Sequence, residues 1–237
     1  MVEAARSARR NRGWLLRAEH VRDAFGLVLL LVLLTYVLTS LLGDRGWEAV
    51  LICLTTSATS IVALTSSHAQ PRLIRAAIWV SALTVSLAVV AAASGANVWL
   101  NVSTAIQVVL LAVAMAAVLR RVVGNAGADS RTILGAISVY TVFGLLFTSL
   151  YAFVARVQDG PFFEGHAHAG GSDFIFFSYT TLTTTGFGDL VPGGQPGRML
   201  AGLEMMIGQI FLVTLVAGLV SLWRPGERFR RQRGEES

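Results

Sequence analysis

The stretch Thr184-Thr185-Gly186-Phe187-Gly188-Asp189 decides how this sequence folds. Two glycines alternate with larger residues, and a carboxylate follows them. Glycine tolerates backbone angles that other residues avoid, so such a strand can turn successive carbonyls toward one side. Rings of carbonyls from identical strands can replace the water around a dehydrated cation. The stretch therefore predicts a cation filter, with a Thr184 hydroxyl at its inner mouth and Asp189 at its outer mouth.

The residues just before this stretch predict a short helix that does not cross a membrane. Phe174–Leu182 is apolar but far shorter than the ~20 residues that span hydrocarbon. Ser172 or Asp173 is a candidate N-cap, and the partly negative C-terminal end of the helix would favour a cation. Backbone that enters a membrane without crossing it must be buried in protein or line water. This indicates a re-entrant pore helix.

The rest of the chain predicts an all-α membrane protein: six transmembrane helices plus one re-entrant pore helix and filter loop per subunit. Of its 237 residues, 54% are hydrophobic and 14% are charged, with a mean hydropathy of +0.64. Such a composition is typical of membrane spans. The spans are expected at about Ala24–Leu42, Glu48–Ser66, Leu73–Ala93, Val98–Leu119, Ile133–Val154 and Met199–Trp223.

Arginines flank the spans unequally and predict the orientation. One side has the many arginines Arg6, Arg9, Arg10, Arg12, Arg17, Arg22, Arg72, Arg75, Arg120, Arg121, Arg131, Arg224, Arg228, Arg230, Arg231 and Arg233. The other side has only Arg45, Arg156 and Arg198. The positive-inside rule then predicts a multi-pass protein of the cell membrane with both termini cytoplasmic. Arginines at the ends of apolar spans also argue against nucleic acid as a partner.

The segment Phe174–Pro192 resembles the pore helix and filter of the tetrameric potassium channel superfamily, whose usual filter reads Thr-Val-Gly-Tyr-Gly-Asp. The similarity extends over about Thr132–Trp223, as in bacterial six-helix members. It implies a homotetramer in the lipid bilayer. It also implies that the carbonyls of Thr184, Thr185, Gly186 and Phe187, followed by Gly188, form the ion path. Phe187 lacks the tyrosine hydroxyl of relatives, so selectivity is the part of the filter that most needs measurement.

Several residues around the filter are candidates for supporting or gating it. Phe176, Phe177 and Tyr179 offer an apolar cuff, Thr180 ends the pore helix, and Asp189 braces the outer mouth. Glu204 is a carboxylate inside a span, where it would brace the pore helix through Thr or Tyr hydroxyls. The candidate hinge is Gly208, for which close packing is an alternative reason. Leu212, Val216 and Val220 recur every four residues as a hydrophobic gate or as ordinary helix packing.

The first four predicted spans, here called the front half, occupy the position of a voltage sensor in the chain but lack the charges of one. The fourth span has no charge before Arg120 and Arg121, and the interiors of the second and third spans have no acidic residue. Each charge that crosses the field yields only about 2.3 kcal/mol per 100 mV, so direct voltage gating is not expected. The predicted divisions are a basic N-terminal segment (1–23), a four-helix domain (24–123), a pore domain (130–223) and a short basic tail (224–237).

The leading function is passive conduction of K⁺ through the filter. A weakly selective cation channel of the same architecture is the alternative. A secondary transporter is less favoured because matched broken helices are not apparent. Catalytic residue sets are also not apparent, so no enzyme is expected. K⁺ is the permeant ion, with no cofactor, no other metal and no soluble ligand-binding domain. Glu164, His166 and His168 have a spacing that suits a divalent metal but also suits an incidental loop.

Overall fold

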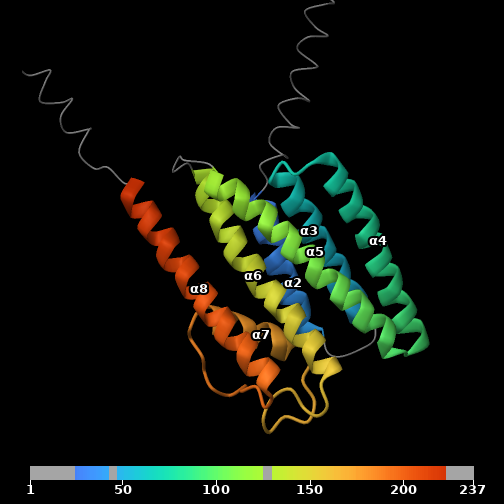
Figure 1. The fold of residues 1–237 in the computed structure, drawn as a ribbon. Coiled ribbons are helices and arrows are strands. Elements are labelled where there is room, and N and C mark those ends of the chain that lie inside the picture. Colours follow the sequence, from blue (N-terminus) through green and yellow to red (C-terminus); the bar gives the residue numbers. More distant parts are fainter. Residues whose placement is uncertain (1–24, 43–46, 125–129, 223–237) are drawn as a thin grey trace, which may run out of the picture.

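The computed structural model describes residues 25–42, 47–124 and 130–222, with only the backbone of 124, 130–132 and 219–222. Within these ranges the chain is built from helices, and its one β-bridge joins Phe163 to Pro192. The helices are α2 (Phe25–Leu41), α3 (Glu48–Ser66), α4 (Pro71–Ser94), α5 (Asn97–Gly124), α6 (Ser130–Val157), α7 (Gly171–Leu182) and α8 (Gln195–Leu222) (Figure 1). The predicted segments 1–23 and 224–237 lie outside the described residues.

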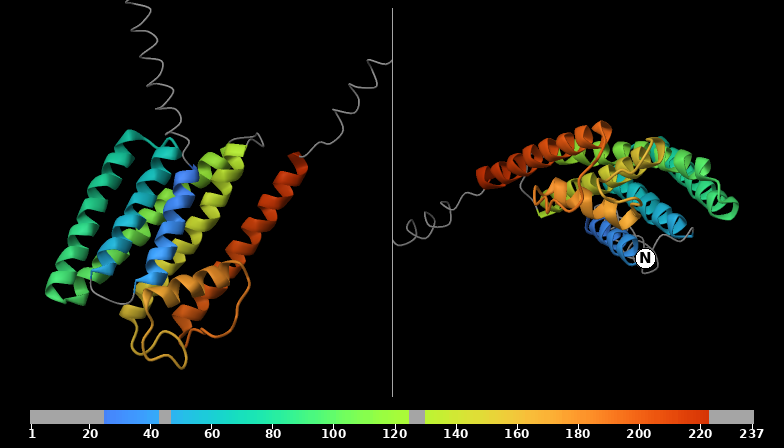
Figure 2. Two further views of the ribbon diagram at one scale, coloured as in Figure 1. Left: turned by 180° about the vertical axis from the view of Figure 1, so that it is seen from behind. Right: turned by 90° about the horizontal axis from the view of Figure 1, so that it is seen from below.

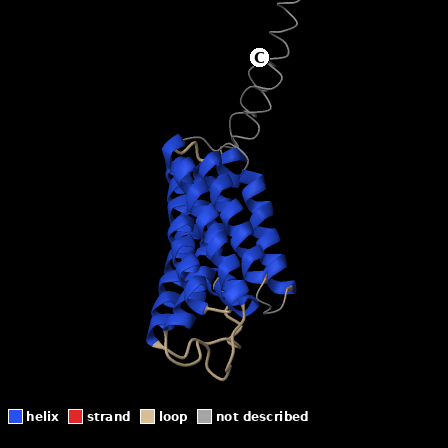
Figure 3. Cartoon of the chain, turned by 90° about the vertical axis from the view of Figure 1, so that its right-hand side faces the viewer, coloured by secondary structure: helices blue, strands red, loops and turns tan. Residues whose placement is uncertain are grey.

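The long helices lie side by side, and the short α7 lies at one end of them (Figures 1 and 2). α8 forms one edge of the molecule, α4 forms the other, and α6 lies between α8 and the front helices. α2 begins and α8 ends at the same end of the bundle. The loops on either side of α7 gather at the opposite end (Figure 3). The filter loop is therefore held at the end away from these two helix termini.

Several helices suit a lipid environment. Among the described residues, α3, α4 and long stretches of α5, α6 and α8 are long and apolar enough to cross a membrane. α2 is apolar but has 17 residues, the lower limit for a span. Large apolar side chains such as Leu33, Trp79 and Ile210 are more than half exposed, which fits contact with lipid or another subunit. The all-α membrane class is confirmed, and the number of six spans stays a prediction.

Several helices extend a few residues beyond their predicted ends, into more polar sequence. α3 matches its predicted range, and α4 begins at Pro71, a residue that suits the first turn. α5 and α6 extend past their apolar cores by a few residues, and α8 begins at Gln195. Length estimates from hydropathy count only the part that suits hydrocarbon, whereas the helical hydrogen bonds continue into the polar boundary.

The front helices contact the pore helix directly. The ring of Tyr36 on α2 packs edge-on against the ring of Tyr179 on α7, with centroids 5.6 Å apart. At the other end of α2, the Ser138 hydroxyl of α6 donates to the Phe25 carbonyl at 3.1 Å. The core beneath α7 is a cluster of aromatic side chains: Tyr151, Phe162, Phe163, Phe174 and Phe177. These contacts fix α7 against both halves.

Candidate functional site

The pore helix begins earlier than the sequence predicted. Its N-cap is Gly170, so the assignment of Ser172 or Asp173 as the N-cap is wrong. Asp173 instead lies in the first turn, where its Oδ2 accepts a hydrogen bond from the Gly170 N–H at 2.9 Å. A carboxylate in the first turn also complements the positive end of the helix. An apolar run marks only the buried part of α7, so sequence alone placed the start too late.

The end of α7 fixes the direction of the first filter carbonyls. The N–H groups of Thr185 and Gly186 both donate to the Thr180 carbonyl, at 2.9 and 3.1 Å. No described peptide bond is cis, and in a trans peptide the carbonyl points opposite to the N–H. The carbonyls of Thr184 and Thr185 therefore point away from α7. Thr180 acts on the filter through its backbone, whereas its hydroxyl donates to the Phe177 carbonyl.

The sign of the backbone angle φ alternates along the filter. Thr184, Gly186 and Gly188 have φ values of 57°, 48° and 81°, while Thr185 and Phe187 have negative φ. Alternation between left- and right-handed conformations turns successive carbonyls to the same side. The two glycines take this conformation easily, but for Thr184 it costs about 1–3 kcal/mol. A strained residue at this position indicates a local structure selected for more than stability.

The filter residues 183–189 are all exposed on the surface of the single chain. The Thr183 hydroxyl bonds the Tyr179 carbonyl at 2.7 Å and lies 2.9 Å from the Thr185 hydroxyl. Among the described residues, the Asp189 carboxylate has no hydrogen-bond or ion-pair partner. The expected support of the outer mouth by Asp189 therefore does not come from these parts of its own chain.

Of the three aromatic residues expected around the filter, only Phe176 contacts Phe187. Their rings are stacked, with centroids 5.8 Å apart and planes 11° apart. Phe177 instead packs with Tyr151 and Phe163 in the aromatic cluster. The Tyr179 hydroxyl donates to the Thr141 carbonyl at 2.8 Å and so ties α7 to α6. Phe177 and Tyr179 thus hold the pore helix, whereas Phe176 holds the filter.

Glu204 joins three helices behind the filter. Its side chain is fully buried on α8. One carboxyl oxygen lies 2.5 Å from the Tyr151 hydroxyl of α6, and the other lies 2.6 Å from the Ser178 hydroxyl of α7. The Ser178 hydroxyl also lies 2.8 Å from the Gly144 carbonyl. Glu204 thus contacts the pore helix through the Ser178 hydroxyl and α6 through the Tyr151 hydroxyl. Its role in bracing the pore helix stays a prediction.

Gly208 lies where α8 touches the end of the pore helix. A Cβ at this position would be 2.7 Å from the Leu182 carbonyl oxygen and 2.8 Å from its side chain. The same carbonyl accepts a hydrogen bond from the Tyr140 hydroxyl at 3.0 Å. α8 runs as a single helix through this position. The geometry gives Gly208 a close-packing role, and the hinge stays a prediction.

Of the predicted gate residues, Leu212 and Val216 do not pack against the hydrophobic core of the described chain. Leu212 and Val216 are 40% and 51% exposed, and the side chain of Val220 is outside the described residues. Packing within the chain therefore does not explain the spacing of Leu212 and Val216. Their role at a constriction stays a prediction.

The loops before and after the filter are fastened to one another. The Glu164 N–H donates to the Val191 carbonyl at 2.8 Å, and the Gly193 N–H donates to the Phe162 carbonyl at 2.9 Å. The Glu164 carboxylate forms a salt bridge with Arg198 at the start of α8. The Glu164 carboxylate thus pairs with Arg198, while the Glu164 backbone carbonyl lies 3.0 Å from the His166 Nδ1.

Sequence reasoning missed three hydroxyl-bearing residues of this site: Tyr140, Tyr151 and Ser178. Each is a single polar residue inside an apolar stretch. Such residues are common in buried helices, so the sequence does not distinguish these three from others. The available signal was Glu204 itself, because a carboxylate inside a span needs buried donors. Sequence could name the chemistry of those donors but not the residues.

Comparisons with known proteins agree with the geometry. Residues 136–224 match the ion channel family. A cyclic nucleotide-gated potassium channel of Rhizobium etli is 36% identical over 107 residues, which cover 44% of this chain and 26% of that protein. Two-pore potassium channel 1 of Arabidopsis thaliana is 35% identical over 54 residues, which cover 23% of this chain and 15% of that protein.

The chain thus matches about a quarter or less of the length of these relatives. No solved structure matches it significantly. The matches are to channel proteins, in agreement with the prediction that the chain is not an enzyme. Residues 136–224 thus match the ion channel family, and the similarity to these two potassium channels supports the resemblance to the tetrameric potassium channel superfamily.

Proposed function

We propose that the chain is one subunit of a homotetrameric, potassium-selective channel whose ion path is lined by carbonyls of Thr184, Thr185, Gly186 and Phe187. The observation that carries this proposal is the backbone of the filter: alternating hand at Thr184, Gly186 and Gly188, with two N–H groups bound to Thr180. Carbonyls that turn away from the pore helix are free to bind an ion. The Thr184 hydroxyl is assigned to the inner mouth.

The surface of the single chain supports assembly with further copies. One chain supplies one strand of carbonyls, and a ring needs several. The filter residues 183–189 are exposed, and so are the apolar side chains of Met199, Met206, Ile210 and Val213 on α8. Four chains around one axis would place the filters together and cover these apolar side chains against neighbours.

Orientation and gating follow from the charges. We assign the end with α7 to the extracellular side and both termini to the cytoplasm, because Arg72, Arg75, Arg120 and Arg121 flank the helices at the opposite end. α5 carries no charge before Arg120. Without charges that move through the field, voltage does not drive the opening directly.

The test is current recorded from purified full-length protein in a planar bilayer. The proposal predicts a cation current that barium blocks. It also predicts that Gly186→Ala abolishes the current, since a Cβ disfavours positive φ there. Gly202→Ala is the matched control, because a Cβ at Gly202 meets nothing within 4 Å. Protein that carries no cation current, or a Gly186→Ala variant that conducts as the original does, would contradict it.

A further inference from the structure

A cavity of about 790 Å³ lies between the front helices and the pore half, away from the filter. Residues of α2, α3, α4, α5, α6 and α7 line it, together with the loop between α6 and α7. Its volume falls within the range of about 300–1,000 Å³ of small-molecule sites. The cavity therefore has room for a ligand, and its polar groups indicate what kind.

A buried carboxylate without a partner faces this cavity. Glu48 is 5% exposed and is the first residue of α3. Among the described residues, nothing donates a hydrogen bond to its carboxylate or forms an ion pair with it. The positive end of α3 favours the negative charge, but a buried charge still calls for a cation or a donor. A ligand bound in the cavity could supply that cation or donor to the Glu48 carboxylate.

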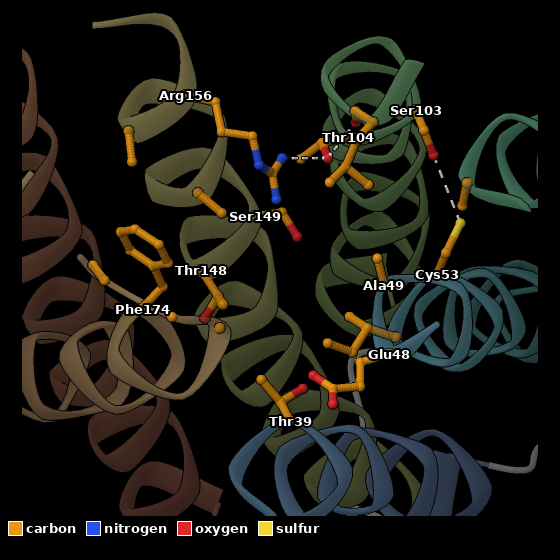
Figure 4. A pocket seen from close by; sticks show the side chains of 18 of the residues that line it. Thr39, Glu48, Ala49, Cys53, Ser103, Thr104, Thr148, Ser149, Arg156 and Phe174 are labelled. Atoms are coloured by element: carbon orange, nitrogen blue, oxygen red, sulfur yellow. Dashed lines mark hydrogen bonds between the residues drawn. The ribbon is translucent and has the colours of Figure 1, made fainter. Parts of the chain in front are cut away.

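A second buried polar group lies on the same side of the cavity. Thr39 is 4% exposed, and its hydroxyl has no hydrogen-bond partner among the described groups. Figure 4 shows the Thr39 hydroxyl facing the Glu48 carboxylate. Buried hydroxyls are nearly always paired, and a hydroxyl can donate one hydrogen bond and also accept. The two groups together therefore form a site rich in acceptor oxygens on this side of the cavity.

A guanidinium lies on another side of the cavity. Arg156 of α6 donates through Nη1 to the Thr104 hydroxyl of α5 at 2.7 Å. No carboxylate in the described parts of the chain forms an ion pair with it. In Figure 4 its side chain points into the cavity, apart from Glu48. The cavity thus presents a cation and an anion that do not neutralise one another.

We propose that this cavity binds a zwitterion with an ammonium group and an anionic oxygen group, the chemistry of phosphoethanolamine. Glu48 and Thr39 bind the ammonium, and Arg156 binds the anionic oxygens, for which its planar fork of donors is well suited. The same chemistry occurs in a lipid headgroup and in a soluble compound. The inference does not depend on ion conduction, because binding is measured without a gradient.

The experiment measures binding to purified full-length protein with two probes. Glycerophosphoethanolamine, a soluble headgroup, is titrated by calorimetry against protein in detergent. Phosphatidylethanolamine and phosphatidylglycerol with identical acyl chains are compared by native mass spectrometry. Binding of the soluble headgroup and of the ethanolamine lipid identifies the headgroup as the ligand. Binding of the lipid alone assigns the site to membrane lipid. Binding of neither probe overturns the proposal.

Variants locate the site. Glu48→Gln and Arg156→Gln each remove a charge without a large loss of volume, and each is expected to weaken binding about tenfold or more. Arg75→Gln is the matched control, because Arg75 on α4 does not line the cavity. If the cavity variants do not fold, a comparison of ligands on wild-type protein tests the proposal instead. The proposal then predicts that the whole zwitterion binds at least tenfold more tightly than ethanolamine or phosphate alone. Equal affinities for the zwitterion and its parts, or cavity variants that bind as tightly as the Arg75→Gln control, would overturn the proposal.

Discussion

The two halves of the molecule treat their buried polar groups differently. Around the pore helix, the fully buried Glu204 has a hydroxyl partner at each oxygen, from Tyr151 and Ser178. In the front helices, Glu48 is almost as buried but has no partner among the described residues. Four deeply buried oxygens without partners were found where side chains are described, and all lie in α2–α5: on Thr39, Ser66, Ser81 and Asn101.

The difference indicates that the pore half and the front helices have different functional requirements. The filter needs fixed geometry, and paired polar groups in a low-dielectric interior provide it. Unpaired groups lower stability, so their persistence in the front half suggests that something else satisfies them. Loss of a paired group should therefore be costly, while loss of an unpaired one should not. The predictions below compare matched positions in this way.

The largest contrast is expected between the two buried glutamates. Glu204→Ala leaves the Tyr151 hydroxyl without its acceptor and opens a void, so we expect a loss of about 3 kcal/mol in the free energy of unfolding. Glu48→Ala removes a carboxylate that borders an existing cavity, and we expect a change below about 1 kcal/mol. Denaturant titration of purified protein in detergent measures both. Equal losses would break the comparison.

A second contrast compares two glycines of α8. Gly208→Ala forces a Cβ to 2.7 Å from the Leu182 carbonyl oxygen, and such overpacking costs about 1–3 kcal/mol. Gly202 has open space, so Gly202→Ala should be neutral or gain up to about 1 kcal/mol from helix propensity. The same titration applies. A Gly208→Ala variant as stable as Gly202→Ala would remove the close-packing role.

A third contrast compares two buried serines. Ser178 touches both Glu204 and the Gly144 carbonyl, so Ser178→Ala should cost about 1–2 kcal/mol. Ser81 is buried with no partner for its hydroxyl among the described groups, so Ser81→Ala should be neutral or stabilising by up to about 1 kcal/mol. Melting temperatures of the two purified variants rank them. A greater loss for Ser81→Ala would reverse the account.

The smallest effect is expected at the rim of the pore half. Glu164 and Arg198 form a salt bridge with side chains 55% and 51% exposed. Exposed pairs contribute about 0.2–1 kcal/mol, so a double-mutant cycle of Glu164→Gln and Arg198→Gln should give a coupling in that range. A coupling well above it would mean that the pair is shielded in the assembled protein. Pairing would then matter at the surface as well as in the core.

Local patterns were enough to predict the pore half in outline. The re-entrant helix followed from an apolar run too short to cross, and the turned backbone at Gly186 and Gly188 followed from glycine itself. Thr184 was predicted to supply a carbonyl and a hydroxyl, but its positive φ was not predictable, because threonine rarely adopts that conformation. It depends on the hydrogen bonds that the next two residues make to Thr180.

Tertiary partners were beyond the sequence. Glu204 and its hydroxyl donors are 53 and 26 positions apart in the chain, and no local period links them. The cavity is even less visible, because Glu48 and Arg156 come from different helices and each reads as an ordinary charge at the end of a span. The Arg156 charge was interpreted only as an orientation signal. Its place beside the cavity emerged from the packing of α5 against α6.

The most direct test of the central claim is a reversal potential measured with K⁺ on one side of a bilayer and Na⁺ on the other. Purified full-length protein is used, with equal concentrations of the two ions. A carbonyl-lined potassium filter predicts a current that reverses far from zero, at a potential that opposes K⁺ flow. A current that reverses near zero would contradict potassium selectivity and leave a weakly selective cation channel.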